Sequence, residues 1–196
     1  MPCGNLRGMQ APYDTQTTAI LVEQLAIRLR ERGLMMATAE SCTGGLIAGA
    51  CTDLSGSSEW FERGMVSYSN AAKTALLGVP ATLIETEGAV SEAVARAMAS
   101  GALTHSDAQC AVAVTGIAGP TGGSAEKPVG TVWFAWATPQ GVFSERQHFS
   151  GDRSTVRQAT VVHALTGLLA RLDSSDDPLG GNISTLARFP PTGEPD

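Results

Sequence analysis

A hydroxyl and a thiol stand side by side at Ser41 and Cys42, where an apolar segment ends and a helix is expected to begin. The next three residues are Thr43, Gly44 and Gly45. Glycines let the backbone approach a bound group closely, and the first turn of a helix presents unpaired N–H groups at the positive end of its dipole. Such a turn can bind an anion, or stabilise an oxyanion while a neighbouring side chain attacks. Residues 38–45 are therefore a candidate nucleophile site.

Ser41 and Cys42 each have an ordinary structural explanation as well. A serine at a strand-to-helix turn is most often the N-cap of the helix. An unpaired cysteine beside a strand end is more often a small buried hydrophobic residue than a nucleophile. The sequence favours Ser41 over Cys42 as the nucleophile, and Cys42 stays as the second candidate.

A histidine base for Ser41 is disfavoured. The three histidines are His105, His148 and His163, and none accompanies a glycine-rich loop. A lysine can act instead when burial or a nearby cation lowers its pKa enough to supply a neutral amine. Lys73 follows a second strand-to-helix corner, which would direct its amine and the Tyr68 hydroxyl toward one region. The alternatives are a solvated surface charge at Lys73, and Lys127 as a rival base within a charged turn.

Two arginines, Arg153 and Arg157, lie one helical turn apart at the start of the last expected helix. A pair of guanidiniums beside a helix N-terminus suits a phosphate or a carboxylate. Surface salt bridges with Asp152 or Glu145 explain the pair equally well.

A glycine-rich loop over residues 115–123 follows an apolar strand. The loop has neither the Gly-x-x-x-x-Gly-Lys-Ser/Thr spacing of a P-loop nor a Gly-x-Gly-x-x-Gly fingerprint. This argues against a kinase, an NTPase and a Rossmann dehydrogenase, although the loop still offers N–H groups to a polar ligand.

Hydrophobic periodicity indicates the elements that must position these residues. Helices are expected from residue 14 to a stop at Gly33, over 43–50, over 70–77, from an N-cap at Ser91, and over 153–172. Strands are expected over 34–39, 65–68 and 110–114, followed by a hairpin of 129–137 and 142–149.

This alternation predicts an α/β fold, a three-layer α/β/α sandwich with a mixed, mostly parallel sheet. Ligands of such sheets bind beyond the carboxyl ends of parallel strands. Both glycine-rich segments, after Ala39 and after Val114, fall at such ends. If the two strands are parallel neighbours, the two loops form one pocket.

Composition limits the function further. A net charge of −6 argues against a nonspecific nucleic-acid binder, and no apolar run reaches the roughly 20 residues of a membrane span. The cysteines at 3, 42, 51 and 110 form no metal motif, and the N-terminus has no signal-peptide core. We therefore expect a cytoplasmic protein with reduced thiols and no metal. Residues 1–13 are expected to be a flexible leader, 14–173 the single domain and 174–196 a disordered tail.

Several motifs in one order carry a resemblance. They are residues 38–45, 56–64, 68–70 with Lys73, 88–91, 115–120, 127–132 and 149–153. Together they resemble the CinA C-terminal domain family, the nicotinamide-nucleotide amidohydrolases of PncC type, over roughly residues 15 to 172. The resemblance implies hydrolysis of the carboxamide of nicotinamide mononucleotide to nicotinic acid mononucleotide and ammonia, in pyridine nucleotide salvage, without a metal or cofactor.

The same resemblance assigns roles to residues. The catalytic serine of the family falls on Ser41, and its partner tyrosine and lysine fall on Tyr68 and Lys73. The expected substrate-binding residues are Cys42, Thr43, Gly44, Gly45, Thr115, Gly116, Gly119, Arg153 and Arg157. Of these, the N–H groups near Thr43 and Gly44 would hold the oxyanion, and Arg153 or Arg157 would take the 5′-phosphate.

Many family members carry a larger N-terminal domain, and only about fourteen residues precede the first expected helix here, so we expect the stand-alone form. A homo-oligomer is also expected. The alternative function is a non-catalytic nucleotide-sensing or partner-binding domain, because the older names of the family refer to competence and DNA damage. The presence of all three residues Ser41, Tyr68 and Lys73 favours the enzyme.

Overall fold

The computed structural model describes residues 15–173, so the predicted leader (1–13) and tail (174–196) lie outside the described residues. In chain order the elements are α1 (Thr15–Glu31), β1 (Met36–Glu40), α2 (Leu46–Thr52), the short 3-10 helix η1 (Ser57–Glu59), β2 (Phe61–Val66), α3 (Asn70–Leu77), α4 (Ala81–Glu87), α5 (Glu92–Thr104), β3 (Cys110–Gly116), β4 (Thr131–Thr138), β5 (Gly141–His148) and α6 (Arg153–Asp173).

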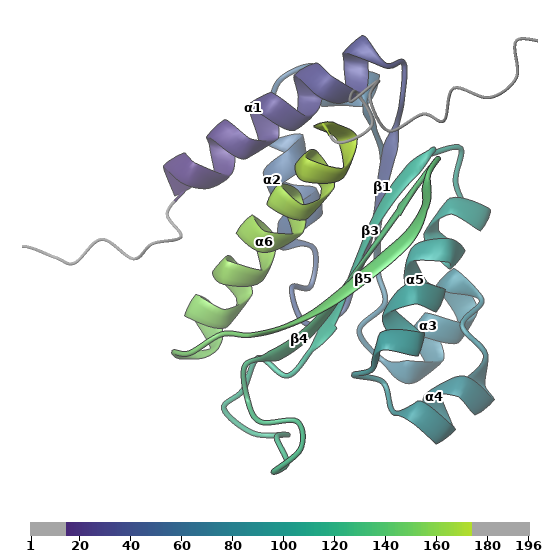
Figure 1. Cartoon of the computed structure of the whole chain (residues 1–196), viewed down its shortest axis with the longest axis vertical. Helices are drawn as coiled ribbons and strands as arrows, with labels where there is room; N and C mark the ends of the chain where they lie inside the picture. The colour runs from purple at the N-terminus through teal and green to yellow at the C-terminus, as the bar shows by residue number, and fades with distance from the viewer. Residues whose placement is uncertain (1–14, 174–196) are drawn as a thin grey trace, which may run out of the picture.

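The five strands form one open sheet in the order β2-β1-β3-β4-β5. β1 pairs in parallel with both β2 and β3, while β4 is antiparallel to β3 and to β5. Only β4 therefore runs against the other strands. Helices α1, α2 and α6 cover one face, and α3, α4 and α5 cover the other (Figure 1). The prediction of a three-layer sandwich with a mixed, mostly parallel sheet is confirmed.

The two faces of the sheet carry side chains of very different size, because successive residues of a strand point to opposite faces. Large residues fill the face under α1, α2 and α6: Met36, Val112, Val114, Phe134 and Trp136. Alanines fill the face under α5: Ala37, Ala39, Ala111, Ala113, Ala135 and Ala137. Small side chains let α5 lie close to the strands, and α5 is itself tight against α3, since a Cβ on Gly101 would lie 2.0 Å from the Leu77 carbonyl oxygen.

Most predicted elements are present, with shifted ends. The helix expected from residue 43 begins at Leu46, because Gly44 and Gly45 take left-handed φ angles of 61° and 97° and keep the chain in a turn. The Ser91 cap is confirmed, since its Oγ accepts from the Val94 N–H. The prediction missed α4, a seven-residue helix that follows Pro80.

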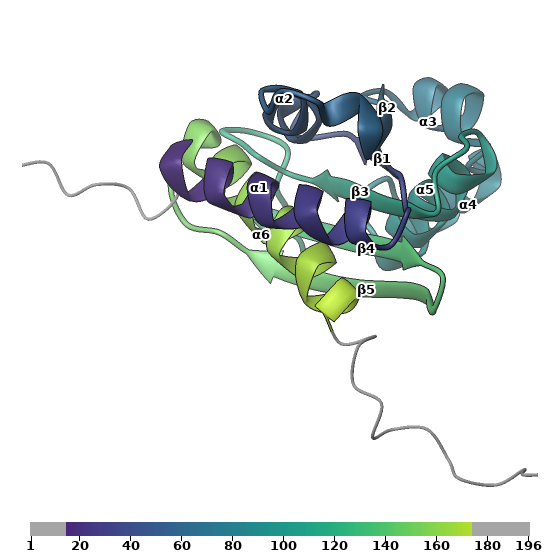
Figure 2. The same ribbon diagram turned by 90° about the horizontal axis from the view of Figure 1, so that it is seen from above.

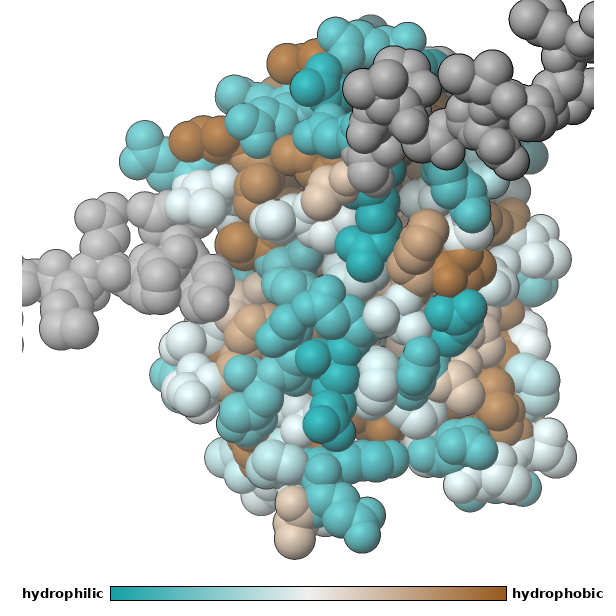
Figure 3. All heavy atoms as spheres, in the orientation of Figure 1, coloured by the Kyte–Doolittle hydropathy of each residue, from teal (hydrophilic) through white to brown (hydrophobic). Residues whose placement is uncertain are grey.

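Helices α1 and α6 lie side by side across one face of the sheet, as the view from above shows (Figure 2). Hydrophilic side chains cover much of the face seen in Figure 3, and hydrophobic ones are visible both near α1 and on the opposite side of the view. Ile20 and Ile27 of α1 are about half exposed. Within residues 15–173, none of the helices has the length and apolarity needed to cross a bilayer.

Candidate active site

Three strand ends meet at one edge of the sheet. β1 and β3 are parallel neighbours, with Glu40 opposite Val114, and the Ser41 N–H continues the ladder by donating to the Val114 carbonyl at 3.1 Å. On the other side, the Ser67 N–H donates to the Glu40 carbonyl at 2.8 Å. The chain order reverses at β1, which is where open α/β sheets bind ligands. The two glycine-rich loops therefore adjoin, as the sequence predicted for parallel neighbours.

A cavity of about 220 Å³ lies at this edge. It is lined by Ser41, Cys42, Tyr68, Asn70, Lys73, Ala89, Val90, Thr115, Gly116, Ala118 and Arg153. None of the three histidines lines it. Among the lining residues, Asn70, Ala89, Val90 and Ala118 had no assigned role in the sequence analysis. All four lie within the motifs that carry the resemblance (68–70, 88–91 and 115–120), but their residue types suggested no chemistry.

Lys73 and Ser41 are in direct contact inside this cavity. Lys73 is only 1% exposed, although it belongs to α3. Its Nζ donates to Ser41 Oγ at 2.9 Å and to the Ser67 carbonyl at 2.9 Å, and a longer contact of 3.4 Å reaches the Tyr68 carbonyl. The Ser69 cap fixes the start of α3, since its side chain accepts from the Ala72 N–H. Lys73 lies one helical turn after Ser69, and its amine points back toward Ser41 and the end of β2.

The surroundings of the Lys73 amine suit its neutral form. A neutral amine has two N–H groups and one lone pair, and here two carbonyl oxygens and one hydroxyl surround the nitrogen. No carboxylate within residues 15–173 forms an ion pair with it. Burial lowers the pKa of Lys73 from its ordinary value of 10.5. When the amine is neutral, its two N–H groups can donate to the two carbonyls and its lone pair can accept from the Ser41 hydroxyl, which is the geometry of a base beside a nucleophile.

Cys42 is poorly suited to attack. Burial is the main cause that raises the pKa of its thiol to about 12, and the nearby Glu40 carboxylate contributes to the same rise. The thiolate is the nucleophilic form of cysteine, so Cys42 is protonated at neutral pH. Its side chain belongs to the core beneath α1, α2 and α6.

Glu40 occupies the helix N-terminus that the sequence analysis left open for an anion. Its buried carboxylate accepts from the N–H groups of Gly45, Ile47 and Ala48 at 2.8 to 3.1 Å. The Gly44 N–H is also committed, because it donates to the Ser41 carbonyl at 3.1 Å. The start of α2 is therefore closed by an internal anion, and the role of Gly44 in holding an oxyanion stays a prediction. An acidic residue next to a helix start was the available signal.

Tyr68 and Arg153 form the opposite wall of the cavity. The Arg153 guanidinium donates to the Tyr68 hydroxyl at 3.1 Å and to the Gly119 carbonyl at 3.0 Å. Tyr68 is 59% exposed, and its contact with Lys73 runs through the main-chain carbonyl. Gly119 acts through its carbonyl on Arg153 and is absent from the cavity lining.

Arg157 contacts the turn of residues 41–45. Its guanidinium donates to the Thr43 carbonyl at 2.6 Å, and a Cβ placed on Gly44 would sit 3.5 Å from the same group. Arg157, Thr43, Gly44 and Gly45 are all absent from the cavity lining. The two arginines of α6 therefore have different positions. Arg153 lines the cavity, and Arg157 contacts the turn from outside the cavity.

Thr115 and Gly116 line the cavity at the end of β3. The Thr115 hydroxyl donates to the Ala89 carbonyl at 2.7 Å and ties the segment before α5 to the sheet. Gly116 leaves no room for a side chain, since a Cβ there would meet the Thr131 carbonyl oxygen at 2.8 Å.

The family model of the CinA C-terminal domain matches residues 18–172. The chain belongs to the CinA C-terminal domain family. The nicotinamide-nucleotide amidohydrolase PncC of Pseudomonas putida is 56% identical over 149 residues, which cover 76% of this chain and 93% of that protein. The protein of the same name from Escherichia coli K12 is 53% identical over 149 residues, 76% of this chain and 90% of its own length.

Solved structures of family members share the fold. The competence/damage inducible protein CihA of Agrobacterium tumefaciens has a TM-score of 0.77 and 48% identity, and the match covers 80% of this chain and 96% of that one.

Proposed function

We propose that this chain hydrolyses the carboxamide of nicotinamide mononucleotide, giving nicotinic acid mononucleotide and ammonia, with Ser41 as nucleophile and Lys73 as base. The observation that carries the proposal is the buried amine of Lys73 at 2.9 Å from Ser41 Oγ. The names of the relatives, at 53 to 56% identity over most of their length, support the substrate.

In the first half of the reaction, neutral Lys73 takes the proton from Ser41 while Oγ bonds to the carboxamide carbon. The tetrahedral intermediate then collapses and breaks the C–N bond. The lysine returns the proton to the leaving nitrogen, which departs as ammonia. The result is an ester between Ser41 and the nicotinoyl group.

In the second half, water attacks the ester carbon and Lys73 accepts the proton from water. The acyl C–O bond breaks and Ser41 recovers its proton from the lysine. The product is nicotinic acid mononucleotide. One lysine therefore moves one proton in each direction during each half, and no metal or cofactor is part of the proposed chemistry.

The remaining wall residues orient the substrate in this proposal. The N–H groups of Cys42 and Thr43 are the donors proposed for the oxyanion, since those of Gly44 and Gly45 are already bonded. A donor of this kind is typically worth about 3 kcal/mol of barrier. Arg153 takes the 5′-phosphate, and Tyr68 supports the base through its carbonyl and holds Arg153 through its hydroxyl.

Ammonia release from nicotinamide mononucleotide tests the proposal in the purified wild type, Ser41→Ala and Cys42→Ala. The wild type and Cys42→Ala should turn over, and Ser41→Ala should lose activity by at least about a thousandfold. Absence of turnover in the wild type would reject the amidase, and the non-catalytic sensing domain would replace it. If Ser41→Ala turned over as fast as the wild type, Ser41 would be rejected as the nucleophile while the amidase activity stood. Loss of turnover in Cys42→Ala would then identify the Cys42 thiol as the nucleophile.

A further inference from the structure

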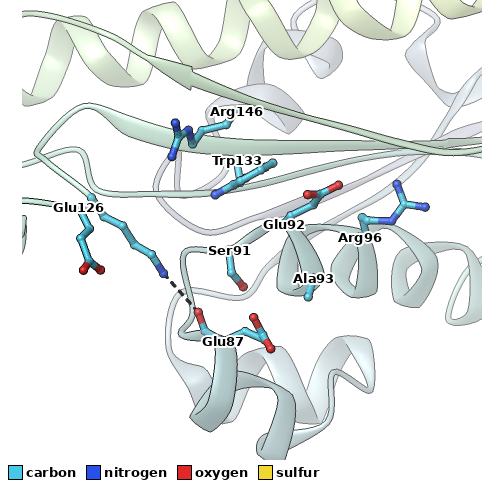
Figure 4. A pocket seen from close by; sticks show the side chains of 9 residues that line it. Glu87, Ser91, Glu92, Ala93, Arg96, Glu126, Trp133 and Arg146 are labelled. Carbon is cyan, nitrogen blue, oxygen red and sulfur yellow. Dashed lines mark hydrogen bonds between the residues drawn. The ribbon is translucent and has the colours of Figure 1, made fainter.

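A second and larger cavity, of about 550 Å³, lies on the alanine face of the sheet (Figure 4). Four separate segments contribute to it: the end of α4, the start of α5, the loop between β3 and β4, and the strands β4 and β5. Its lining residues are Glu87, Ser91, Glu92, Ala93, Arg96, Glu126, Lys127, Trp133 and Arg146. No step of the proposed reaction uses any of them.

Some charges of this cavity neutralise one another and others do not. Arg96 donates to the Ser144 hydroxyl at 3.1 Å, and that hydroxyl donates to the Glu92 carboxylate at 2.6 Å, which makes a self-contained chain. The guanidinium of Arg146 has no hydrogen bond or ion pair within the described residues. Lys127 reaches a single acceptor, the Glu87 carbonyl, at 3.2 Å. The cavity therefore keeps two cations available to an anion.

Trp133 forms the aromatic wall. It lies on the face that β4 also lines with Ala135 and Ala137, and it is only partly buried. Trp133 lies opposite Arg146 in the β4–β5 pair, and Figure 4 shows the two side chains next to each other. An indole that lines a cavity beside a guanidinium can stack on a planar ring while the guanidinium holds an anion.

The two uncommitted carboxylates belong to Glu87 and Glu126, and both residues are exposed. Within the described residues neither carboxylate has a hydrogen-bond or ion-pair partner. Carboxylates accept hydrogen bonds from sugar hydroxyls in nucleotide sites. A planar ring, a hydroxyl-bearing sugar and a phosphate would thus each meet a matching group.

This cavity is separate from the catalytic one, but the two share a wall. Ala89 and Val90 line the catalytic cavity, while Glu87 and Ser91 line the second. The Lys127 amine lies close to the same segment, since a Cβ on Gly88 would be 3.5 Å from it. A ligand in the second cavity would therefore contact the segment that Thr115 ties to the catalytic edge.

We propose that the second cavity binds a nucleotide, with its ring on Trp133, its phosphate on Arg146 and Lys127, and its sugar hydroxyls on Glu87 and Glu126. The chemistry recognised is a heteroaromatic ring that bears a sugar phosphate, and both purine and pyridine nucleotides have it. This site is additional to the cavity of Ser41 and does not depend on the proposed reaction.

Tryptophan fluorescence gives a direct test, because Trp60 and Trp136 are fully buried and Trp133 is the accessible indole. The full chain carrying Ser41→Ala is titrated with AMP, with nicotinic acid mononucleotide and with inorganic phosphate. We expect saturable quenching by at least one nucleotide at concentrations where inorganic phosphate has no effect. AMP alone would identify a purine site, and nicotinic acid mononucleotide alone would identify a pyridine site.

Variants locate the signal. Trp133→Phe should abolish the quenching, and Arg146→Ala should weaken binding about tenfold, as expected for one lost charge-assisted hydrogen bond. Arg28→Ala removes an exposed arginine on α1 as a matched control and should leave binding unchanged. Absence of quenching by both nucleotides would overturn the proposal. The proposal would also be overturned if inorganic phosphate quenched the fluorescence as strongly as the nucleotides do. Quenching that Arg153→Ala abolishes and Arg146→Ala leaves intact would overturn it too, because the ligand would then bind in the cavity of Ser41. Because the readout is binding, its failure is distinct from a failure of the amidase.

Discussion

The chain has two lysines, and each lines one of the two cavities on either side of the segment before α5. Lys73 is almost fully buried and its amine contacts three oxygens. Lys127 is partly buried and its amine contacts one carbonyl. The same side chain is thus placed in two opposite situations a short distance apart in the fold.

The different surroundings of the two lysines suit one cavity to proton transfer and the other to ligand binding. In the cavity of Ser41, the side chains of Lys73, Thr115 and Arg153 are hydrogen-bonded to protein oxygens, and burial lowers the pKa of Lys73 toward the neutral base. In the second cavity the Lys127 amine donates to one carbonyl, and the Arg146 guanidinium has no hydrogen bond or ion pair within the described residues, so both are available to an anionic ligand. Substitutions in the first should therefore damage turnover or folding, and those in the second should affect ligand binding alone.

The largest effect is expected from removal of Lys73, the proposed base. Lys73→Met should lower kcat for nicotinamide mononucleotide by at least about a thousandfold, because the general base is lost. Lys73→Arg is the matched control: it keeps a cation that cannot give up its proton, and should be equally inactive. Activity in Lys73→Arg would contradict a proton-transfer role. The measurement is ammonia release under saturating substrate.

Lys73 should also leave a trace in the pH dependence of stability. Its folded pKa is lowered from 10.5, so below that pH the unfolded chain binds more protons than the folded chain. The free energy of unfolding therefore rises with pH between the lowered pKa and 10.5. Lys73→Met should remove this rise in urea unfolding curves. Buried thiols such as Cys42 act in the opposite sense above about pH 9, but they are common to both proteins and cancel in the comparison.

Loss of the internal anion of α2 should be the next largest effect. Glu40→Gln leaves an amide NH₂ group facing N–H donors and should reduce the free energy of unfolding by about 2 kcal/mol. Glu31→Gln, an exposed glutamate on α1, serves as the control and should change it by less than about 0.5 kcal/mol. Equal effects in urea unfolding would show that the buried carboxylate does not anchor the turn.

The two arginines of α6 should act on different kinetic constants. Arg157→Met loosens the turn that carries Ser41 and should lower kcat about tenfold with little change in KM. Arg153→Met should raise KM for nicotinamide mononucleotide about tenfold more than KM for nicotinamide riboside, which lacks the phosphate. An unchanged KM ratio in Arg153→Met would remove the phosphate role from that residue.

The smallest effect on folding is expected in the second cavity. Arg146→Ala should change the free energy of unfolding by less than about 0.5 kcal/mol, because the guanidinium has no partner to lose within the described residues. Thermal unfolding checks this directly. A loss of 1 kcal/mol or more would mean that Arg146 stabilises the fold, and the comparison between the two cavities would weaken.

Sequence patterns could place Ser41 and Lys73 because each follows a strand at a strand-to-helix corner, and local periodicity locates such corners. The same reasoning located both glycine-rich loops and the cap at Ser91. Local sequence patterns could not predict the hydrogen-bond partner of each polar group. Glu40 lies within the run that drew attention to the site, yet its bonds to Ile47 and Ala48 exist only once Gly44 and Gly45 have turned the chain.

Residues brought together from distant parts of the chain were also out of reach. Arg157 meets the Thr43 carbonyl from 114 positions away, so its direction depends on how α6 crosses the sheet. The second cavity combines segments from Glu87 to Arg146, including α4, which the periodicity did not predict. Side-chain direction on a helix is set by packing against neighbouring elements, which no local pattern records.

The protonation state of Lys73 decides whether this residue can act as the base. With lysine labelled with ¹³C at Cε, the chain gives two signals, and Lys127→Arg leaves only that of Lys73. If Lys73 is the base, this signal should titrate with a midpoint below pH 10.5. The value of kcat/KM for nicotinamide mononucleotide should rise with pH around the same midpoint. A lysine that stays charged across the whole pH range of activity would contradict the proposed base.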